Sequence, residues 1–379
     1  MKFLFIIQGE GRGHLTQSIA LKDMLARNGH EVVGALVGKS KRRELPDFFS
    51  KNMNIPIYRF NSPNFISNCK NRKDNIWESI FYNFLKAALY FRSIAFIRKM
   101  IRKSDADVVV NFYELLTGLS YICLPPKTPY VSIAHQYLFL HPNYKFPTQN
   151  ITELKMLEFF TRFTCFGASR VFALSLIKHE NDDLSNMVIV PPLLRKEILD
   201  IQVSRGNYLH GYILNDAYAD DIIAFQKKHP DVNMHFFWDR KGAGEETVIN
   251  EHLTFHRLND KKFVEYMAGC KAYATTAGFE SVCEAMYMGK PTLMVPTHIE
   301  QACNAHEASL TGAGVVANYF DIELVLNYIP EYKKNNEYCN WVEQSEKYWM
   351  KAFDFKKDEL AKNRLNYKFL FRRNRQLHA

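Results

Sequence analysis

The feature that most constrains the fold is an alternation of short apolar runs with longer amphipathic ones, in two successive series. Buried strands are expected in the first series at 2–7, 31–38, 107–112 and 129–135. A helix is expected between the first two, at 15–27, ended by Asn28-Gly29. The second series is expected at 207–214, 232–238, 253–258, 271–276 and 291–296. Such alternation is typical of parallel α/β architecture.

The chain is long enough for two domains. Its 379 residues allow each half to bury its own core. The run 188–192 ends in two prolines, which closes the first series, so we place a boundary near 190–205. We therefore expect Rossmann-like halves at 1–195 and 196–335. The remaining segment, 336–379, is expected to be a helix crossing back to the first half, followed by a basic tail.

Composition excludes several classes of protein. Hydrophobic residues make up 47% and charged residues 23% of the chain, which predicts a folded globular protein. No stretch approaches the ~18 apolar residues of a membrane span, and the apolar opening MKFLFII is too short for a signal-peptide core. The seven cysteines are scattered without a CxxC pair, which predicts neither a disulfide framework nor a zinc site. A cytoplasmic protein is the expectation.

Positive charge is concentrated in two segments. Residues 70–103 carry nine Lys/Arg against two acids, and residues 356–379 carry eight against two. In both segments aromatic residues lie among the cations, which favours contact with an anionic membrane surface. The alternative for 70–103 is a helix packed on the first sheet with a basic outer face. No nucleic-acid-binding module is recognisable, so nucleic acid is not expected as a partner.

The opening loop, Gln8-Gly-Glu-Gly-Arg-Gly-His14, lies between an expected strand and an expected helix. It departs from G-x-G-x-x-G, and the second strand ends without an acid, so a nicotinamide cofactor is not expected. His14 lies at the ligand-binding edge of the sheet and is suited to accept a proton. Glu114 and His135 follow two other strands at that edge and are candidates to assist His14 or orient an acceptor. The alternatives are a tight turn for the loop, and capping or hydrogen-bonded loop roles for Glu114 and His135.

A second candidate segment spans 271–305. A strand leads through Ala277-Gly278 into a short helix from about Phe279 to Met288, whose free N–H groups form an anion site. Ser281 adds a hydroxyl, and Glu284 lies one turn later on the same side of the helix. The alternative is that this Ser-x-x-Glu pair is a capping box. Polar residues after the next strand, at 297–304, lie where α/β sheets form pockets.

The order TTAGFESVCEAMYMGKP…VP…EQ…NA resembles the donor-binding signature of GT-B nucleotide-sugar glycosyltransferases. It is closest to the group of the lipid II-forming N-acetylglucosaminyltransferase and the galactosyl-diacylglycerol synthases. The resemblance implies two Rossmann-like domains with parallel sheets facing across a cleft, the first on the acceptor side and the second binding the donor. It implies inverting transfer of a sugar from a UDP-sugar to a lipid, glycan or other cell-envelope acceptor.

The resemblance also assigns roles to residues. His14 would be the base or would line the leaving-group site, and Glu284 would hold the ribose hydroxyls. The sugar would be held by Glu300 and Gln301; the pattern has Asp where this chain has Glu300, which leaves the sugar open. Residues 253–260 match the segment that in such enzymes contacts the uracil ring, and we call them the uracil segment. The remaining donor-site residues fall in the glycine loop, the uracil segment and the second candidate segment: Gly11, Arg12, Gly13, Phe255, His256, Leu258, Thr276, Ala277, Gly278, Ser281 and Asn304.

No metal or other cofactor is expected. Asp105-Ala-Asp107 imitates a metal-binding DxD but precedes its strand, so we interpret it as a solvated strand entry. A helix N-terminus and nearby cations would stabilise the leaving diphosphate instead. Two alternative functions remain open at this point. One is a nucleotide-sugar epimerase or hydrolase on the same fold, and the other is a catalytically silent nucleotide-sugar-binding protein.

Overall fold

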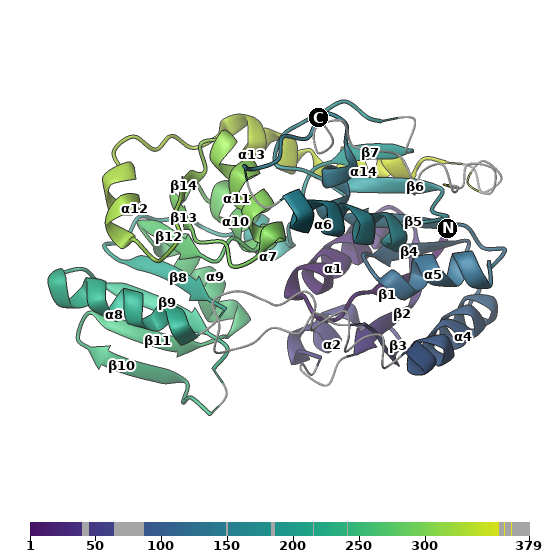
Figure 1. The fold of residues 1–379 in the computed structure, drawn as a ribbon, viewed down its shortest axis with the longest axis horizontal. Helices are drawn as coiled ribbons and strands as arrows, with labels where there is room; N and C mark the ends of the chain where they lie inside the picture. Colours follow the sequence, from purple (N-terminus) through teal and green to yellow (C-terminus); the bar gives the residue numbers. More distant parts are fainter. Residues whose placement is uncertain are drawn as a thin grey trace. The chain divides into compact units, whose positions relative to one another are not determined.

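The computed structural model describes residues 1–39, 45–63, 87–148, 151–182, 186–214, 216–240 and 242–355, together with 360 and 365. The chain divides into two compact units (Figure 1). The first comprises the described residues up to Arg195 and those from Gln344 onward, and the second is Lys196–Glu343. No helix in this described part of the chain is long and apolar enough to cross a membrane.

The first unit is built on a seven-stranded parallel sheet. Its strand order is β3-β2-β1-β4-β5-β6-β7. The bounds are β1 (Lys2–Ile7), β2 (Glu31–Lys39), β3 (Ile57–Asn61), β4 (Val108–Phe112), β5 (Tyr130–Ala134), β6 (Arg170–Leu174) and β7 (Met187–Val190). The central strands β4 and β5 are buried along their whole length, because helices cover both faces of the sheet. The four strands predicted for the first series are confirmed to within one or two residues.

Helices connect these strands and cover the sheet. Their bounds are α1 (Arg12–Arg27), α2 (Asp47–Met53), α4 (Ala87–Lys103), α5 (Leu115–Cys123), the 3-10 helix η1 (Gln136–Leu140), α6 (Ile151–Thr164) and α14 (Ser345–Phe353). Helix α1 is confirmed but begins three residues earlier than predicted. It ends as predicted, at Asn28 and at Gly29, whose φ is +74°.

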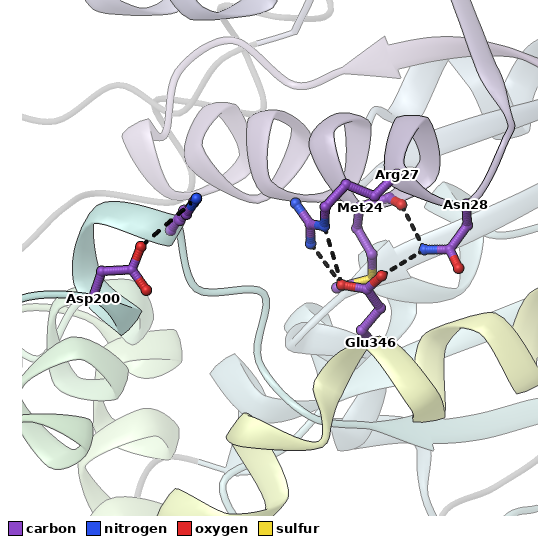
Figure 2. Close-up of polar contacts among 6 residues, drawn as sticks. Met24, Arg27, Asn28, Asp200 and Glu346 are labelled. Carbon is purple, nitrogen blue, oxygen red and sulfur yellow. Dashed lines mark hydrogen bonds and ion pairs between the residues drawn. The ribbon is translucent and has the colours of Figure 1, made fainter.

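Helix α14 returns to the first unit. Glu346 accepts hydrogen bonds from Arg27 (2.7 Å, from Nη2) and from Asn28 (2.7 Å) at the end of α1, as Figure 2 shows. Trp349 is fully buried, packs edge-on against Phe172 of β6, and donates from Nε1 to the carbonyl oxygen of Pro191. The single helix expected at the start of 336–379 is therefore two helices, α13 (Asn336–Glu343) in the second unit and α14 in the first.

The second unit has its own seven-stranded sheet, in the order β10-β11-β9-β8-β12-β13-β14. Its strands are parallel except that β10 pairs antiparallel with β11. The bounds are β8 (Leu209–Ile213), β9 (Met234–Trp238), β10 (Glu246–Asn250), β11 (Leu253–Arg257), β12 (Ala272–Thr275), β13 (Thr292–Met294) and β14 (Gly314–Val316). All five predicted strands of the second series are confirmed.

The helices of the second unit alternate with these strands. They are α7 (Lys196–Leu199), the 3-10 helix η3 (Asp216–Tyr218), α8 (Ala219–Lys228), α9 (Asp260–Gly269), α10 (Phe279–Tyr287), α11 (Ile299–Leu310), α12 (Ile322–Tyr328) and α13. A core of aromatic and aliphatic side chains, including Phe236, Trp238 and Phe255, lies under the sheet. In both sheets the loops after the parallel strands meet at one edge, which places the two candidate segments at the carboxyl edges of their own sheets.

Candidate active site

His14 lies in the first turn of α1, directly after the glycine loop. The N-cap is Gly11, which has no side chain to cap the helix. The N-terminus of α1, the positive end of its dipole, lies at the carboxyl edge of the sheet because α1 follows β1. The loop makes a tight turn, because a Cβ at Gly9 would collide with the carbonyl oxygen of Gly38. The loop can therefore be both a tight turn and part of a site. The close approach of Gly9 to Gly38 sets the path of the chain that leads to His14.

The imidazole of His14 is held by two neighbours. Its ring stacks on Tyr113 with centroids 5.7 Å apart, and its Nδ1 lies 3.4 Å from Oε1 of Gln17. An amide oxygen only accepts, so Nδ1 carries the proton and Nε2 has the lone pair that can accept one. Burial lowers the pKa of His14 to about 4, against a smaller opposing effect of the Gln17 hydrogen bond. His14 is therefore neutral at pH 7 and is a weak base.

Tyr113 orients this histidine, and the sequence reasoning did not identify it. It follows β4 with a φ of 56°, a left-handed conformation that costs a non-glycine residue free energy. Its hydroxyl lies 2.7 Å from Oγ1 of Thr161 on α6, which ties the ring to a second element. An aromatic residue immediately after a buried strand was the available signal, but its contact with His14 depends on the tertiary fold.

Glu114 serves as the N-cap of α5. Its carboxylate accepts from the backbone N–H of Leu116 (3.1 Å) and from the hydroxyl of Ser62, which lies 2.8 Å from each oxygen. A Cβ at Gly38 would lie 2.8 Å from Oε2 of Glu114, so the carboxyl group fills the space left by that glycine. Burial raises the pKa of Glu114 to about 7, opposed by these hydrogen bonds. The geometry supports the capping alternative for this residue.

His135 follows β5 at the same edge but is tied to β6. Its Nδ1 donates to the carbonyl oxygen of Leu174 at 2.8 Å, which fixes the tautomer and leaves Nε2 as the acceptor. Its ring packs edge-on against Phe139. Within the described residues, neither Glu114 nor His135 makes a hydrogen bond or ring contact with His14. The structure therefore places the three predicted catalytic residues at one sheet edge without joining them directly.

The second candidate segment contains a helix that begins at a glycine. Gly278 is the N-cap of α10 and has no side chain with which to cap the first turn. The hydroxyl of Ser281 donates instead to the carbonyl oxygen of Gly278 at 3.1 Å. This excludes the capping-box alternative, in which Ser281 itself would be the N-cap. The N-terminus of α10 is the positive end of the helix dipole, which suits an anion.

Ala277 gives this loop its shape. Its φ of 60° is left-handed, and its carbonyl oxygen accepts from Nδ2 of Asn304 on α11 at 3.2 Å. The side chains of Thr276, Ala277 and Asn304 are buried, so Thr276 and Ala277 can meet a ligand only through their backbone. Asn304 acts as a brace that holds the loop against α11. The strained alanine is a feature that sequence reasoning could not reveal, since its conformation is set by its neighbours.

The predicted ribose and sugar contacts lie at the starts of α10 and α11. Glu284 is buried one turn after Ser281 on α10. Gln301 accepts through Oε1 from the backbone N–H and the hydroxyl of Thr297, at 2.9 and 2.8 Å. This ties the oxygen of Gln301 to its own loop. Glu300, beside it in the first turn of α11, is partly exposed.

The predicted uracil segment is mostly core. Phe255 is fully buried and stacks on Trp238 with centroids 4.4 Å apart. His256 is buried, with Nε2 3.1 Å from Nδ1 of His235 and Nδ1 3.4 Å from Oε1 of Glu246. Leu258 is the partly exposed member, and its N–H donates to the carbonyl oxygen of Trp238. Any contact with a base therefore falls to Leu258 and its backbone, because the other two side chains are turned into the unit.

This pair of Rossmann-like sheets is the GT-B fold of glycosyltransferases. The structure is similar to the kitacinnamycin glycotransferase (TM-score 0.63, 13% identity, 95% of this chain and 99% of that one). It is also similar to Arabidopsis thaliana UGT89C1 in complex with UDP-L-rhamnose (TM-score 0.59, 13% identity, 93% and 94%). A third similar structure is the glycosyltransferase SnogD from Streptomyces nogalater (TM-score 0.54, 16% identity, 92% and 95%).

The model of glycosyl transferase family 1 matches residues 1–331. The chain belongs to this family and is a glycosyltransferase. No curated sequence matches the chain.

Proposed function

We propose that this protein transfers a sugar from a UDP-sugar, with inversion, to a lipid or glycan acceptor. The observation that carries the proposal is the N-terminus of α10, which begins after Gly278, with Ser281 in its first turn and Glu284 one turn later. A diphosphate suits the positive end of the helix dipole, and a carboxylate at that spacing suits the ribose diol. The complexes of Arabidopsis thaliana UGT89C1 with UDP and with UDP-L-rhamnose support this class of donor.

In the proposed reaction the acceptor hydroxyl attacks C1 of the sugar from the face opposite the diphosphate. The bond between C1 and the diphosphate oxygen breaks, UDP leaves, and Nε2 of His14 takes the proton of the hydroxyl. Gln17 and Tyr113 hold the imidazole so that Nε2 is the acceptor. A nearby anionic ligand would raise the low pKa of His14 and strengthen it as a base. The helix N-terminus stabilises the leaving charge without a metal ion.

The first test is donor binding followed by thermal denaturation. UDP, UDP-sugars, GDP-mannose and dTDP-glucose are compared, and UDP compounds are expected to raise the Tm. A ligand at a hundred times its Kd stabilises the native state by about 2.7 kcal/mol. The variant Ser281→Ala should lose part of this shift. Ser309→Ala is the matched control, since its hydroxyl also donates to the carbonyl three residues earlier but lies at the end of α11.

The second test separates transfer from its alternatives. Radiolabelled UDP-sugar is incubated with a membrane-lipid extract, and label in lipid, in free sugar and in an altered nucleotide sugar is measured. Label moving into lipid or a glycan supports transfer. Release of free sugar at the same rate with and without acceptor would establish a hydrolase. Formation of an isomeric nucleotide sugar would establish an epimerase. If no nucleotide raises the Tm, the donor site itself is wrong.

A further inference from the structure

Helix α4 has an outer face that neither the fold nor the proposed transfer reaction uses. Its inner face is formed by Ile94, Ile97 and Ile101, which are buried. The helix packs on β3 and α5. The outer face carries Ala88, Phe91, Arg92, Ala95, Lys99, Arg102 and Lys103, all exposed. We call these residues, together with the half-buried Arg98, the α4 face.

The charge of the α4 face is entirely positive. Helix α4 contains five Lys/Arg and no acid. None of the five has an ion pair or hydrogen bond among the residues that the structure describes, and Nε of Arg98 is buried without a partner there. The nearest acids in the sequence are engaged elsewhere, since Asp105 pairs with Lys2 and Asp107 accepts from the backbone N–H of Lys2.

The cations gather around a hollow. An open depression of about 330 Å³ is lined by Ala95, Arg98, Lys99, Arg102, Lys103 and, from the end of α5, Leu124. Attraction to the negative end of the helix dipole accounts for Arg102 and Lys103 in the last turn. It does not account for Arg98 and Lys99 a full turn earlier, nor for the absence of acids that an ordinary solvated face would carry. Such a cluster is suited to phosphate groups.

An exposed aromatic side chain extends the same face. Phe91 is 64% exposed and lies on one helical stripe with Ala95, Lys99 and Arg102, at spacings of four, four and three residues. The stripe is roughly 16 Å long, at about 1.5 Å per residue, which exceeds a single phosphate. A surface with many phosphates and an apolar interior uses both the cations and the phenylalanine.

We propose that the α4 face binds the surface of an anionic lipid bilayer, with α4 lying along it. Helix α4 ends at Lys103, shortly before the amino end of β4, and the hollow lies over its last two turns, so the hollow lies at the sheet edge opposite His14. The contact is therefore separate from the reacting groups of this unit. It goes beyond the transfer reaction and does not depend on it.

The experiment is co-sedimentation of the full chain with vesicles of phosphatidylcholine, with and without 30% phosphatidylglycerol. We expect binding only to the anionic vesicles, weakened by salt. A cation near such a surface contributes about a fivefold gain in binding, so the triple variant Arg98→Glu/Lys99→Glu/Arg102→Glu should bind at least about a hundredfold more weakly. Phe91→Ala should bind several-fold more weakly at unchanged charge.

The matched control is Lys227→Glu/Lys228→Glu/Lys261→Glu, which makes the same change of net charge on exposed residues of α8 and α9. It should retain binding to within a few-fold. Circular dichroism and the Tm check that every variant is folded, and the UDP-induced Tm shift is recorded separately, so failure of the donor proposal is seen independently.

Equal binding to neutral and anionic vesicles, or an equal loss of vesicle binding in the control variant, would overturn the proposal. So would inorganic phosphate that displaces the protein from vesicles more effectively than sodium chloride at the same ionic strength. Binding to single-stranded DNA as tight as binding to anionic vesicles, with no effect of Phe91→Ala, would also overturn it.

Discussion

At the scale of single residues, the proposed base differs from a histidine paired with a carboxylate. Gln17 contributes an amide oxygen, which fixes the tautomer without adding negative charge, and Tyr113 supplies a stacking surface. Both features leave burial as the dominant influence on the pKa of His14. The folded chain consequently orients the imidazole. Its pKa, and with it its strength as a base, would rise only when an anionic ligand binds beside it.

His14→Ala should reduce sugar transfer by about 100-fold or more, because general base catalysis contributes about 10²–10⁴-fold. The UDP-induced Tm shift should stay close to that of the wild type. Transfer is measured from labelled UDP-sugar into lipid. His229→Ala serves as the control, since among the described residues its ring contacts Phe225 at the end of α8, in the other unit. A His14→Ala enzyme that keeps more than a tenth of the rate would remove His14 from the role of base.

Tyr113→Phe tests the orientation of His14 separately. It keeps the stacked ring and removes the 2.7 Å contact with Thr161. We expect a modest fall in kcat, of about threefold to tenfold, with KM for the donor unchanged, since one net hydrogen bond is worth about 1 kcal/mol. Thr161→Val should give a similar fall, because it removes the same contact from the other side. A change in donor KM alone would contradict a positioning role.

At the scale of elements, two of the contacts that hold α14 to the first unit differ in strength. The contact of Glu346 with Arg27 and Asn28 is exposed, although those hydrogen bonds lower the pKa of Glu346 (Figure 2). Exposed ion pairs contribute about 0–1 kcal/mol. Trp349, by contrast, is fully buried against Phe172 of β6.

Trp349→Ala should lower the free energy of unfolding by about 3–5 kcal/mol, the range for emptying a large aromatic site in a core. Glu346→Ala should lower it by less than about 1 kcal/mol. Both are measured by urea denaturation of the full chain. Equal effects of the two substitutions would mean that α14 is anchored by charge and not by packing.

The elements that sequence patterns located best are the buried parallel strands, since they are continuous apolar runs bounded by turn residues. Strand β10 was missed because its residues, ETVIN, are largely exposed and have no apolar pattern. The break between α13 and α14 at Gln344 was also missed, as both helices continue a similar pattern on either side.

At the site, the residue types were predictable from the sequence, but the partners of those residues were not. The capping by Glu114 and the strain at Ala277 depend on contacts between distant segments.

At the scale of the whole molecule, buried titratable groups act on stability in opposite directions. Burial lowers the pKa of His14 to about 4, of His210 to about 3 and of His235 to about 4. The unfolded chain then binds more protons than the native one below about pH 6.5, so stability falls as pH falls through that range. Glu114, with its pKa raised to about 7, keeps its proton longer in the native state, so its contribution falls as pH rises from about 4.5 to 7.

Glu114→Gln should therefore make the dependence of stability on pH steeper. The variant keeps an amide oxygen for the N–H of Leu116, but its side chain no longer titrates. Between about pH 4.5 and 7 the rise of stability with pH that the histidines cause is then no longer offset by Glu114. Relative to the wild type, the variant should gain up to about 3 kcal/mol across that interval. Urea denaturation at several pH values measures it. Parallel stability curves would show that Glu114 does not titrate in this range.

The return of α14 has a consequence for synthesis. The first unit is completed by residues that follow the entire second unit, since Lys196–Glu343 lies between Arg195 and Gln344. At the usual rate of translation, roughly 10 to 30 s pass between the emergence of β7 and that of Trp349. During that interval the site for Trp349 beside Phe172 stays open, so the nascent chain exposes an apolar patch to chaperones while its second unit is already able to fold.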